Sequence, residues 1–232
     1  MIGSAGRRPA RALVFLLWVL GGIVPGLLGA AAGGPLGVEE TEALVRRVDY
    51  EGMPEDEAVR IGPAGGARLI EMLSDPEERP HHARILLALG SWGGSGAIEA
   101  IRRFRAALPV KGELDRGTFR AWQSLPFALG RLARHEPGAV ADLTARFDAD
   151  PPGWSFRHFR SERLLALEQR ATATALAETR LPEAARALDA LARRPHAPAV
   201  TEHLRAVQAE MQIEMQAGAT PAVNGRTPGG VP

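Results

Sequence analysis

Cysteine is absent from the 232 residues of the chain. Its absence excludes a disulfide scaffold, a thiolate zinc site, a cysteine nucleophile and a lipid anchor attached to cysteine. Residues that favour strands are also scarce, because valine, isoleucine and tyrosine together number 22, whereas alanine alone numbers 40. An extended β-sandwich or barrel is therefore not expected, and the composition predicts an all-α protein.

Motifs of common catalytic and cofactor sites are also missing. The sequence has no glycine-rich phosphate loop before a helix, no Gly-x-Ser-x-Gly elbow and no His-Glu-x-x-His pair. Adjacent side chains on a helix point about 100° apart, so His81 and His82 are not expected to share a metal. We therefore expect no metal site and no cofactor, and no catalytic residue is nominated. The histidines considered are His81, His82, His135, His158, His196 and His203.

The first 32 residues carry the most specific signal in the sequence. Three arginines within residues 7–11 precede an uncharged stretch at 12–32, which is broken by Pro25 and ends in three alanines. This pattern predicts a signal peptide cleaved after Ala32, and hence a periplasmic or secreted protein. The alternative is an uncleaved inner-membrane anchor formed by residues 12–32, since 21 residues at ~1.5 Å each reach about 30 Å. Such an anchor would be the chain's only attachment to a membrane.

Composition divides the rest of the chain into four parts. Residues 33–37 predict a linker, and residues 38–150 predict helices separated by proline and glycine. Residues 151–216 predict a further helical region, whose last helix from Pro198 to Gln216 caps the domain. Residues 217–232 carry a single charge and too little apolar surface to fold, so they predict a disordered tail.

A short repeat lies within the first helical region. Ala88-Leu89-Gly90 recurs 40 residues later as Ala128-Leu129-Gly130, and each is followed by a loop and a similar apolar pattern, at 97–104 and 139–147. Periods of this length are typical of helical-hairpin repeats, in which each pair buries its apolar face by stacking on its neighbours.

These residues resemble a known family. The run from Ile61-Gly62-Pro63 through 69–76 to Ala88-Leu89-Gly90 and Ala97-Ile98 is similar to the HEAT-like repeats of bacterial helical solenoids, and the resemblance covers 61–147. Where that family usually has a Val-Arg pair, this chain has two histidines, at 81 and 82. The resemblance implies an α-solenoid of stacked hairpins that acts as an interaction scaffold. A minority of the family are bilin lyases, and no catalytic residue is carried over.

Charge is distributed unevenly along the chain. Residues 36–78 contain 12 acids and 4 bases, whereas residues 101–135 contain 8 bases and 2 acids. In a stack of repeats this pattern predicts an acidic end and a basic middle. Scattered solvated charge is the alternative. The arginines of the basic section are candidates to bind an acidic segment of a partner or anionic groups of the envelope, namely Arg102, Arg103, Arg105, Arg116, Arg120, Arg131 and Arg134.

Aromatic residues are also clustered. All nine phenylalanines and tryptophans beyond residue 32 fall between Trp92 and Phe159. Trp154, Phe156 and Phe159 are interleaved with arginine and histidine, as in a binding loop or in an anchored connection between subdomains. We favour packing of the connection over stacking on a ligand, and keep these three residues as candidates for partner binding.

The sequence therefore predicts a non-catalytic exported scaffold that binds another envelope protein. Nucleic acid is not expected as a partner, because removal of residues 1–32 leaves 25 bases and 27 acids. One alternative is an envelope enzyme, a lyase or hydrolase, with a site assembled across repeats. Another is a structural module that self-associates through oppositely charged ends.

Overall fold

The computed structural model describes residues 34–47 and 52–219. The predicted signal peptide and most of the predicted tail lie outside these residues. The described part is all-α, as its composition predicted, with one pair of two-residue strands, β1 (Gly112–Glu113) and β2 (Trp154–Ser155). Its helices are α1 (Val38–Arg46), α2 (Glu55–Ala58), α3 (Pro63–Ser74), the 3-10 helix η1 (Pro76–His81), α4 (His82–Trp92), α5 (Ala97–Ala106), α6 (Arg116–Leu132), α7 (Gly138–Phe147), α8 (Ser161–Thr179), α9 (Pro182–Ala192) and α10 (Pro198–Ala219).

Several helix ends lie where proline, glycine and aspartate place them. Pro63 and Pro182 stand in the first turns of α3 and α9, where a missing N–H costs nothing. Asp115 caps α6 by accepting a hydrogen bond from the backbone N–H of Thr118 at 3.0 Å. The last helix begins at Pro198 as expected, but it continues to Ala219, three residues past the expected boundary of the tail.

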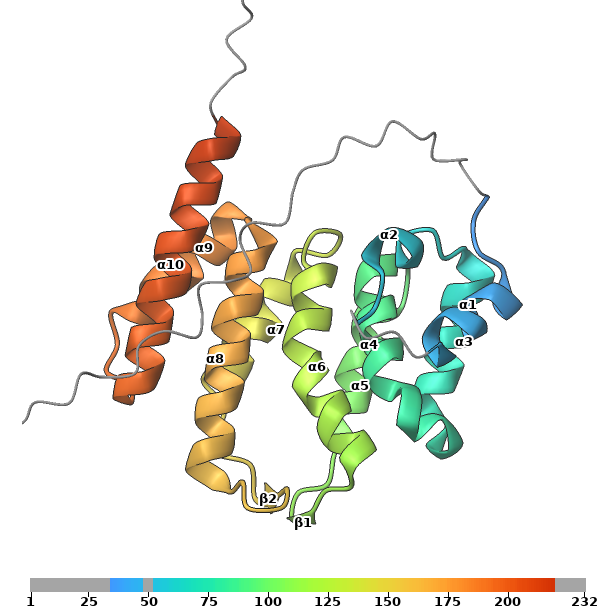
Figure 1. The fold of residues 1–232 in the computed structure, drawn as a ribbon, viewed down its shortest axis with the longest axis horizontal. Coiled ribbons are helices and arrows are strands. Elements are labelled where there is room, and N and C mark those ends of the chain that lie inside the picture. The colour runs from blue at the N-terminus through green and yellow to red at the C-terminus, as the bar shows by residue number, and fades with distance from the viewer. Residues whose placement is uncertain (1–33, 48–51, 220–232) are drawn as a thin grey trace, which may run out of the picture. The chain divides into compact units, whose positions relative to one another are not determined.

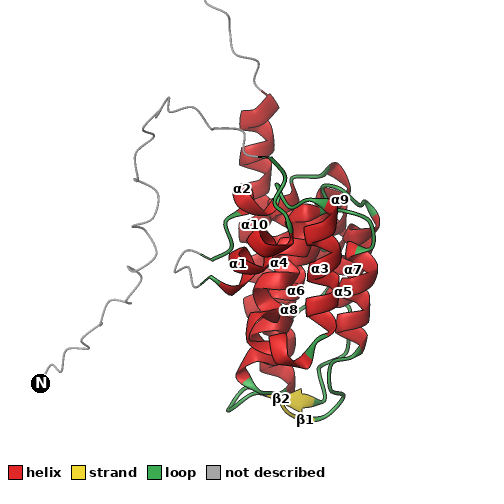
Figure 2. Cartoon of the chain, turned by 90° about the vertical axis from the view of Figure 1, so that its right-hand side faces the viewer, coloured by secondary structure: helices red, strands yellow, loops and turns green. Residues whose placement is uncertain are grey.

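The helices form two layers. Helices α4, α6, α8 and α10 lie next to one another in that order, with the most extensive contact between α4 and α6 (Figure 1). Helices α3, α5, α7 and α9 make up the second layer, seen edge-on in Figure 2. Each of α5, α7 and α9 contacts the first-layer helices on either side of it in the sequence. None of the helices within the described residues is long and apolar enough to cross a membrane.

Glycine allows the first-layer helices to approach closely. A Cβ atom on Gly90 of α4 would lie 2.3 Å from the carbonyl oxygen of Ala128 on α6, and one on Gly130 of α6 would lie 2.9 Å from that of Ala175 on α8. The repeated Ala-Leu-Gly triplet therefore marks successive helix contacts. A third triplet, Ala175-Leu176-Ala177, follows on α8, so the C-terminal region continues the packing of the first region.

Two backbone pairings hold connecting segments in place. Strand β1, between α5 and α6, pairs in parallel with β2, between α7 and α8. In the segment expected to be a linker, the Leu36 N–H donates to the carbonyl of Arg60 at 2.7 Å, and the Gly62 N–H donates to the carbonyl of Leu36 at 3.0 Å. Residues 34–37 are therefore part of the folded unit.

Candidate functional site

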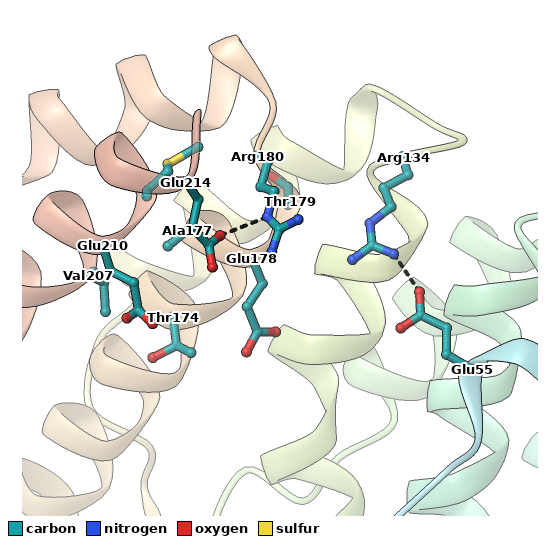
Figure 3. A pocket seen from close by; sticks show the side chains of 11 residues that line it. Glu55, Arg134, Thr174, Ala177, Glu178, Thr179, Arg180, Val207, Glu210 and Glu214 are labelled. Atoms are coloured by element: carbon teal, nitrogen blue, oxygen red, sulfur yellow. Dashed lines mark hydrogen bonds and ion pairs between the residues drawn. The ribbon is translucent and has the colours of Figure 1, made fainter. Parts of the chain in front are cut away.

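A cleft of about 530 Å³ opens between α8 and α10 on one side and α2 and the end of α6 on the other. Figure 3 shows its side chains, which come from opposite walls. Thr174 and Glu178 lie one helical turn apart on α8, as do Glu210 and Glu214 on α10, so each helix presents a row of polar groups. We call this the charged cleft, and its lining residues are Glu55, Arg134, Thr174, Ala177, Glu178, Thr179, Arg180, Val207, Glu210, Met211 and Glu214.

Ion pairs lie on both walls of the charged cleft. On one wall Arg134 pairs with Glu55, and the Nε of Arg131 lies 3.8 Å from the same carboxylate. On the other wall the Nε of Arg180 donates to Glu214 at 2.7 Å (Figure 3). Arg180 ends α8 with a φ of 56°, a conformation that favours glycine. Arg180 thus places a long cationic side chain at a position whose backbone conformation suits glycine better.

The other two carboxylates of the charged cleft are those of Glu178 and Glu210. Glu178 and Glu210 form no ion pair with any residue that the structure describes. Partial desolvation raises the pKa of Glu178, against the lowering effect of Arg131 and Arg134. Four glutamates face two arginines in the lining, so the cleft is acidic and suits a cationic group.

A smaller pocket of about 260 Å³ adjoins the charged cleft at Thr174, which lines both. The Thr174 hydroxyl lies 2.9 Å from Nε2 of His203 on α10. Burial lowers the pKa of His203, so its ring is neutral at pH 7. We call this the apolar pocket, and its lining residues are Trp122, Gln123, Pro126, Phe127, Arg146, Leu167, Glu168, Arg170, Ala171, Thr174 and His203.

The charged cleft and the apolar pocket follow one another along α8 and α10 and share the lining residue Thr174. We refer to the two together as the α8–α10 groove. Arg146 and Glu168, which also line the apolar pocket, form an ion pair whose side chains are only 2% and 7% exposed. Burial lowers the pKa of Arg146 to about 10 and raises that of Glu168. The α8–α10 groove therefore has an acidic end and an apolar end. At the apolar end, the buried charges of Arg146 and Glu168 compensate each other.

The structure brings only part of the predicted basic group to this groove. Arg134 lines the charged cleft and Arg131 lies next to this lining, and both face Glu55 of the acidic section. The acidic and basic sections are thus in contact here, through Glu55 and Arg134, which are 79 residues apart in the sequence. Arg102 instead pairs with Asp142 at 2.7 Å.

The other four arginines lie on α5 and at the start of α6. Arg105 is half-buried on the last turn of α5. Its charge adds to the effect of burial in lowering the pKa of Arg146, and it opposes the effect of burial, which raises the pKa of Glu168. Arg103, Arg116 and Arg120 are exposed and form no ion pair with any described residue. These three remain the candidates for an acidic partner.

The predicted aromatic residues pack within the protein. Phe156 stacks on Phe119 of α6 with 3.9 Å between ring centroids, and Trp154 meets Trp122 edge to face at 4.9 Å. Phe159 lies beside the same cluster, 6.5 Å from Phe119. These contacts anchor the connection between α7 and α8 on α6, the role favoured from the sequence.

Sequence reasoning missed the carboxylates of the groove, above all Glu178. Glu178 can be identified by its position in the repeat, because it directly follows the third triplet. The residues at the same position after the first two triplets are Ser91 on α4 and Arg131 on α6. Arg131 donates to the Ser91 hydroxyl at 3.1 Å, and its charge also acts on Glu178. Recognition of the third triplet would have aligned these three positions.

Within the described residues, no group of three or more histidines, aspartates or glutamates is placed to hold a metal ion. Comparison of the chain with protein-family models, with curated proteins and with solved structures gives no match.

Proposed function

We propose that this chain is a non-catalytic exported scaffold whose α8–α10 groove binds a segment of another envelope protein. The observation that carries the proposal is the junction of the charged cleft and the apolar pocket at Thr174. A cationic side chain of the partner would face Glu178 and Glu210, and a neighbouring apolar side chain would enter the pocket lined by Phe127 and Leu167. Apolar anchors next to complementary charge are typical of specific interfaces.

We also propose that the fold is a HEAT-like α-solenoid of stacked hairpins. Three successive hairpins, α4 with α5, α6 with α7 and α8 with α9, are joined through close contacts of the first-layer helices. The glycines of the Ala-Leu-Gly triplets lie at both of these contacts, Gly90 between α4 and α6 and Gly130 between α6 and α8. Repeats that stack in this way present long concave surfaces to partners.

Export is proposed from residues 1–32, with residues 12–32 as an inner-membrane anchor in the alternative. The acidic segment first expected in the partner remains a proposal for Arg103, Arg116 and Arg120, which lie outside the α8–α10 groove. A partner that uses both surfaces would place basic residues in the groove and acidic residues on these arginines.

Site-specific cross-linking in intact bacterial cells tests the function. A photoreactive residue replaces Arg170, which is exposed beside the apolar pocket, and in a matched control it replaces Glu183, which is exposed on α9. We expect a protein adduct from position 170 and none from position 183. Mass spectrometry of the adduct reads both the contacted segment and the N-terminus of the chain. Equal adducts at both positions, or an adduct segment without basic residues, would contradict the proposal.

Protonation of Glu178 is expected to weaken binding of the contacted segment. Because the pKa of Glu178 is raised above the ordinary value of 4.5, affinity should fall as the pH decreases through that raised pKa. The double variant Glu178→Gln/Glu210→Gln is expected to lose about tenfold or more in affinity at pH 7 and most of this pH dependence. Calorimetric titration with a synthetic peptide of the segment measures both effects. The control Glu183→Gln removes an exposed carboxylate outside the groove and should bind as the parent does.

A further inference from the structure

A second cleft lies apart from the α8–α10 groove, between η1, the end of α5 and the start of α6. We call it the η1–α5 cleft. It shares no lining residue with the charged cleft or the apolar pocket, and its volume is about 530 Å³. Small-molecule sites are typically clefts of about 300–1,000 Å³ with mainly apolar walls and a few polar groups.

The inner wall of the η1–α5 cleft is apolar. Leu73 comes from the end of α3, Phe104 comes from the end of α5, and Leu108 follows α5 in the chain. His82 packs edge-on against Phe104 with 5.3 Å between ring centroids, and its Nε2 lies 3.0 Å from the carbonyl of Asp75. Burial lowers the pKa of His82, so the ring adds no charge to this wall at pH 7.

The rim of the cleft carries two arginines with uncommitted donors. Arg103 forms no ion pair with any described residue, and Arg79 forms a long ion pair with Asp115 at 3.8 Å, beyond hydrogen-bond distance. Asp115 already accepts hydrogen bonds from the backbone N–H and the hydroxyl of Thr118, at 3.0 and 2.7 Å. Asp115 is the one carboxylate in the lining, and it stands against the two guanidinium groups of Arg79 and Arg103, so the net charge of the lining is positive.

The backbone that carries Arg79 is held firmly. Helix η1 contains Pro76 and Pro80, which restrict its conformation. Gly117, in the first turn of α6, lies against this backbone, because a Cβ at this position would be 3.0 Å from the carbonyl oxygen of Arg79. A guanidinium on a fixed backbone loses less entropy when it binds an anion.

We propose that the η1–α5 cleft binds a small amphipathic carboxylate. The carboxylate head would lie between Arg79 and Arg103, whose planar guanidinium groups match it in geometry and charge. The apolar chain would lie against Leu73, Phe104 and Leu108. This site has no lining residue in common with the α8–α10 groove. It uses Arg103, which is proposed above for an acidic segment of a partner, and binding of an acidic peptide separates the two assignments of Arg103.

Calorimetric titration of the full-length chain with decanoate below its micelle concentration tests the proposal. Arg103→Glu is expected to weaken decanoate binding at least tenfold, because a bound carboxylate would lose a charge-assisted hydrogen bond and meet a like charge. Leu108→Asp, which places a charge on the apolar wall, is expected to weaken it by a similar factor. The matched control is Arg186→Glu on α9, an exposed position far from the cleft in the sequence. Residues 1–32 are identical in all variants, so any binding there cancels.

Decanol and decyltrimethylammonium complete the experiment. Both are expected to bind at least tenfold more weakly than decanoate, since they keep the chain and remove or invert the charge. Equal affinities of decanoate for Arg103→Glu and Arg186→Glu, or equal affinities of decanol and decanoate, would overturn the proposal. Binding of an acidic peptide without binding of decanoate would also overturn it and would assign these arginines to a protein partner.

Discussion

Replacement of Gly90 by leucine is expected to lower the free energy of unfolding by about 3 kcal/mol. A larger side chain in a packed interior costs most where its neighbours cannot move away from it. The first side-chain atom would lie 2.3 Å from the carbonyl oxygen of Ala128 and 2.9 Å from its carbonyl carbon. These are backbone atoms of a neighbouring helix, so they cannot swing aside as a side chain can. Helices α4 and α6, which share the most extensive contact in the fold, must separate.

Urea unfolding followed by circular dichroism measures this loss. The control is Gly138→Ala in the first turn of α7, where a Cβ would meet its nearest neighbour at 3.6 Å, an ordinary contact. That variant is expected to be unchanged or more stable, by up to about 1 kcal/mol, since alanine favours a helix more than glycine does. An unfolding midpoint of Gly90→Leu equal to that of the parent would refute the close contact between α4 and α6.

The sequence predicted the packing of α4 on α6 better than that of α6 on α8. The first contact carries glycine in an obvious repeat, 40 residues before the next triplet. In the third triplet Ala177 replaces the glycine, and the spacing grows to 47 residues because α6, α7 and their connections differ in length from their predecessors. A search for a repeat of fixed spacing and fixed residues misses the third triplet because of these two differences. The central leucines of the three triplets are nevertheless all buried, namely Leu89, Leu129 and Leu176.

The groove was harder to predict than the helices. Glu55, Glu178 and Glu210 come from three helices. Only Glu178 has a signal in the sequence, its position after the third triplet, and the other two have no local pattern that separates them from ordinary solvated acids. The uneven charge along the sequence led us to expect an acidic end and a basic middle of the stack. In the structure, Glu55 of the acidic section instead pairs with Arg134 of the basic section. Composition and helix periodicity report local structure, and the meeting of side chains across layers depends on the tertiary arrangement.

Replacement of Arg146 by methionine is expected to lower the free energy of unfolding by about 3–5 kcal/mol, the range for a buried ion pair that loses one partner. Glu168 would remain 7% exposed without its cation. Desolvation already raises its pKa while Arg146 opposes the shift, so removal of Arg146 should raise it further. The folded state then binds a proton that the unfolded state has released above about pH 4.5. The stability of Arg146→Met should therefore decrease as the pH rises above that value, towards the folded-state pKa.

Urea unfolding of Arg146→Met at pH 5 and pH 8 measures this dependence, and the double variant Arg146→Met/Glu168→Leu separates the lost charge from the lost packing. Removal of both charges from a buried pair is often neutral or stabilising, so the double variant should recover most of the loss and its pH dependence. The control is Arg102→Met, which breaks a pair whose arginine is 49% exposed and should cost at most about 1 kcal/mol. A double variant as unstable as Arg146→Met would show that the pair acts through shape, because Arg146 and Glu168 also line the apolar pocket. Recovery of stability in the double variant would show instead that Arg146 stabilises the fold by compensating the buried charge of Glu168.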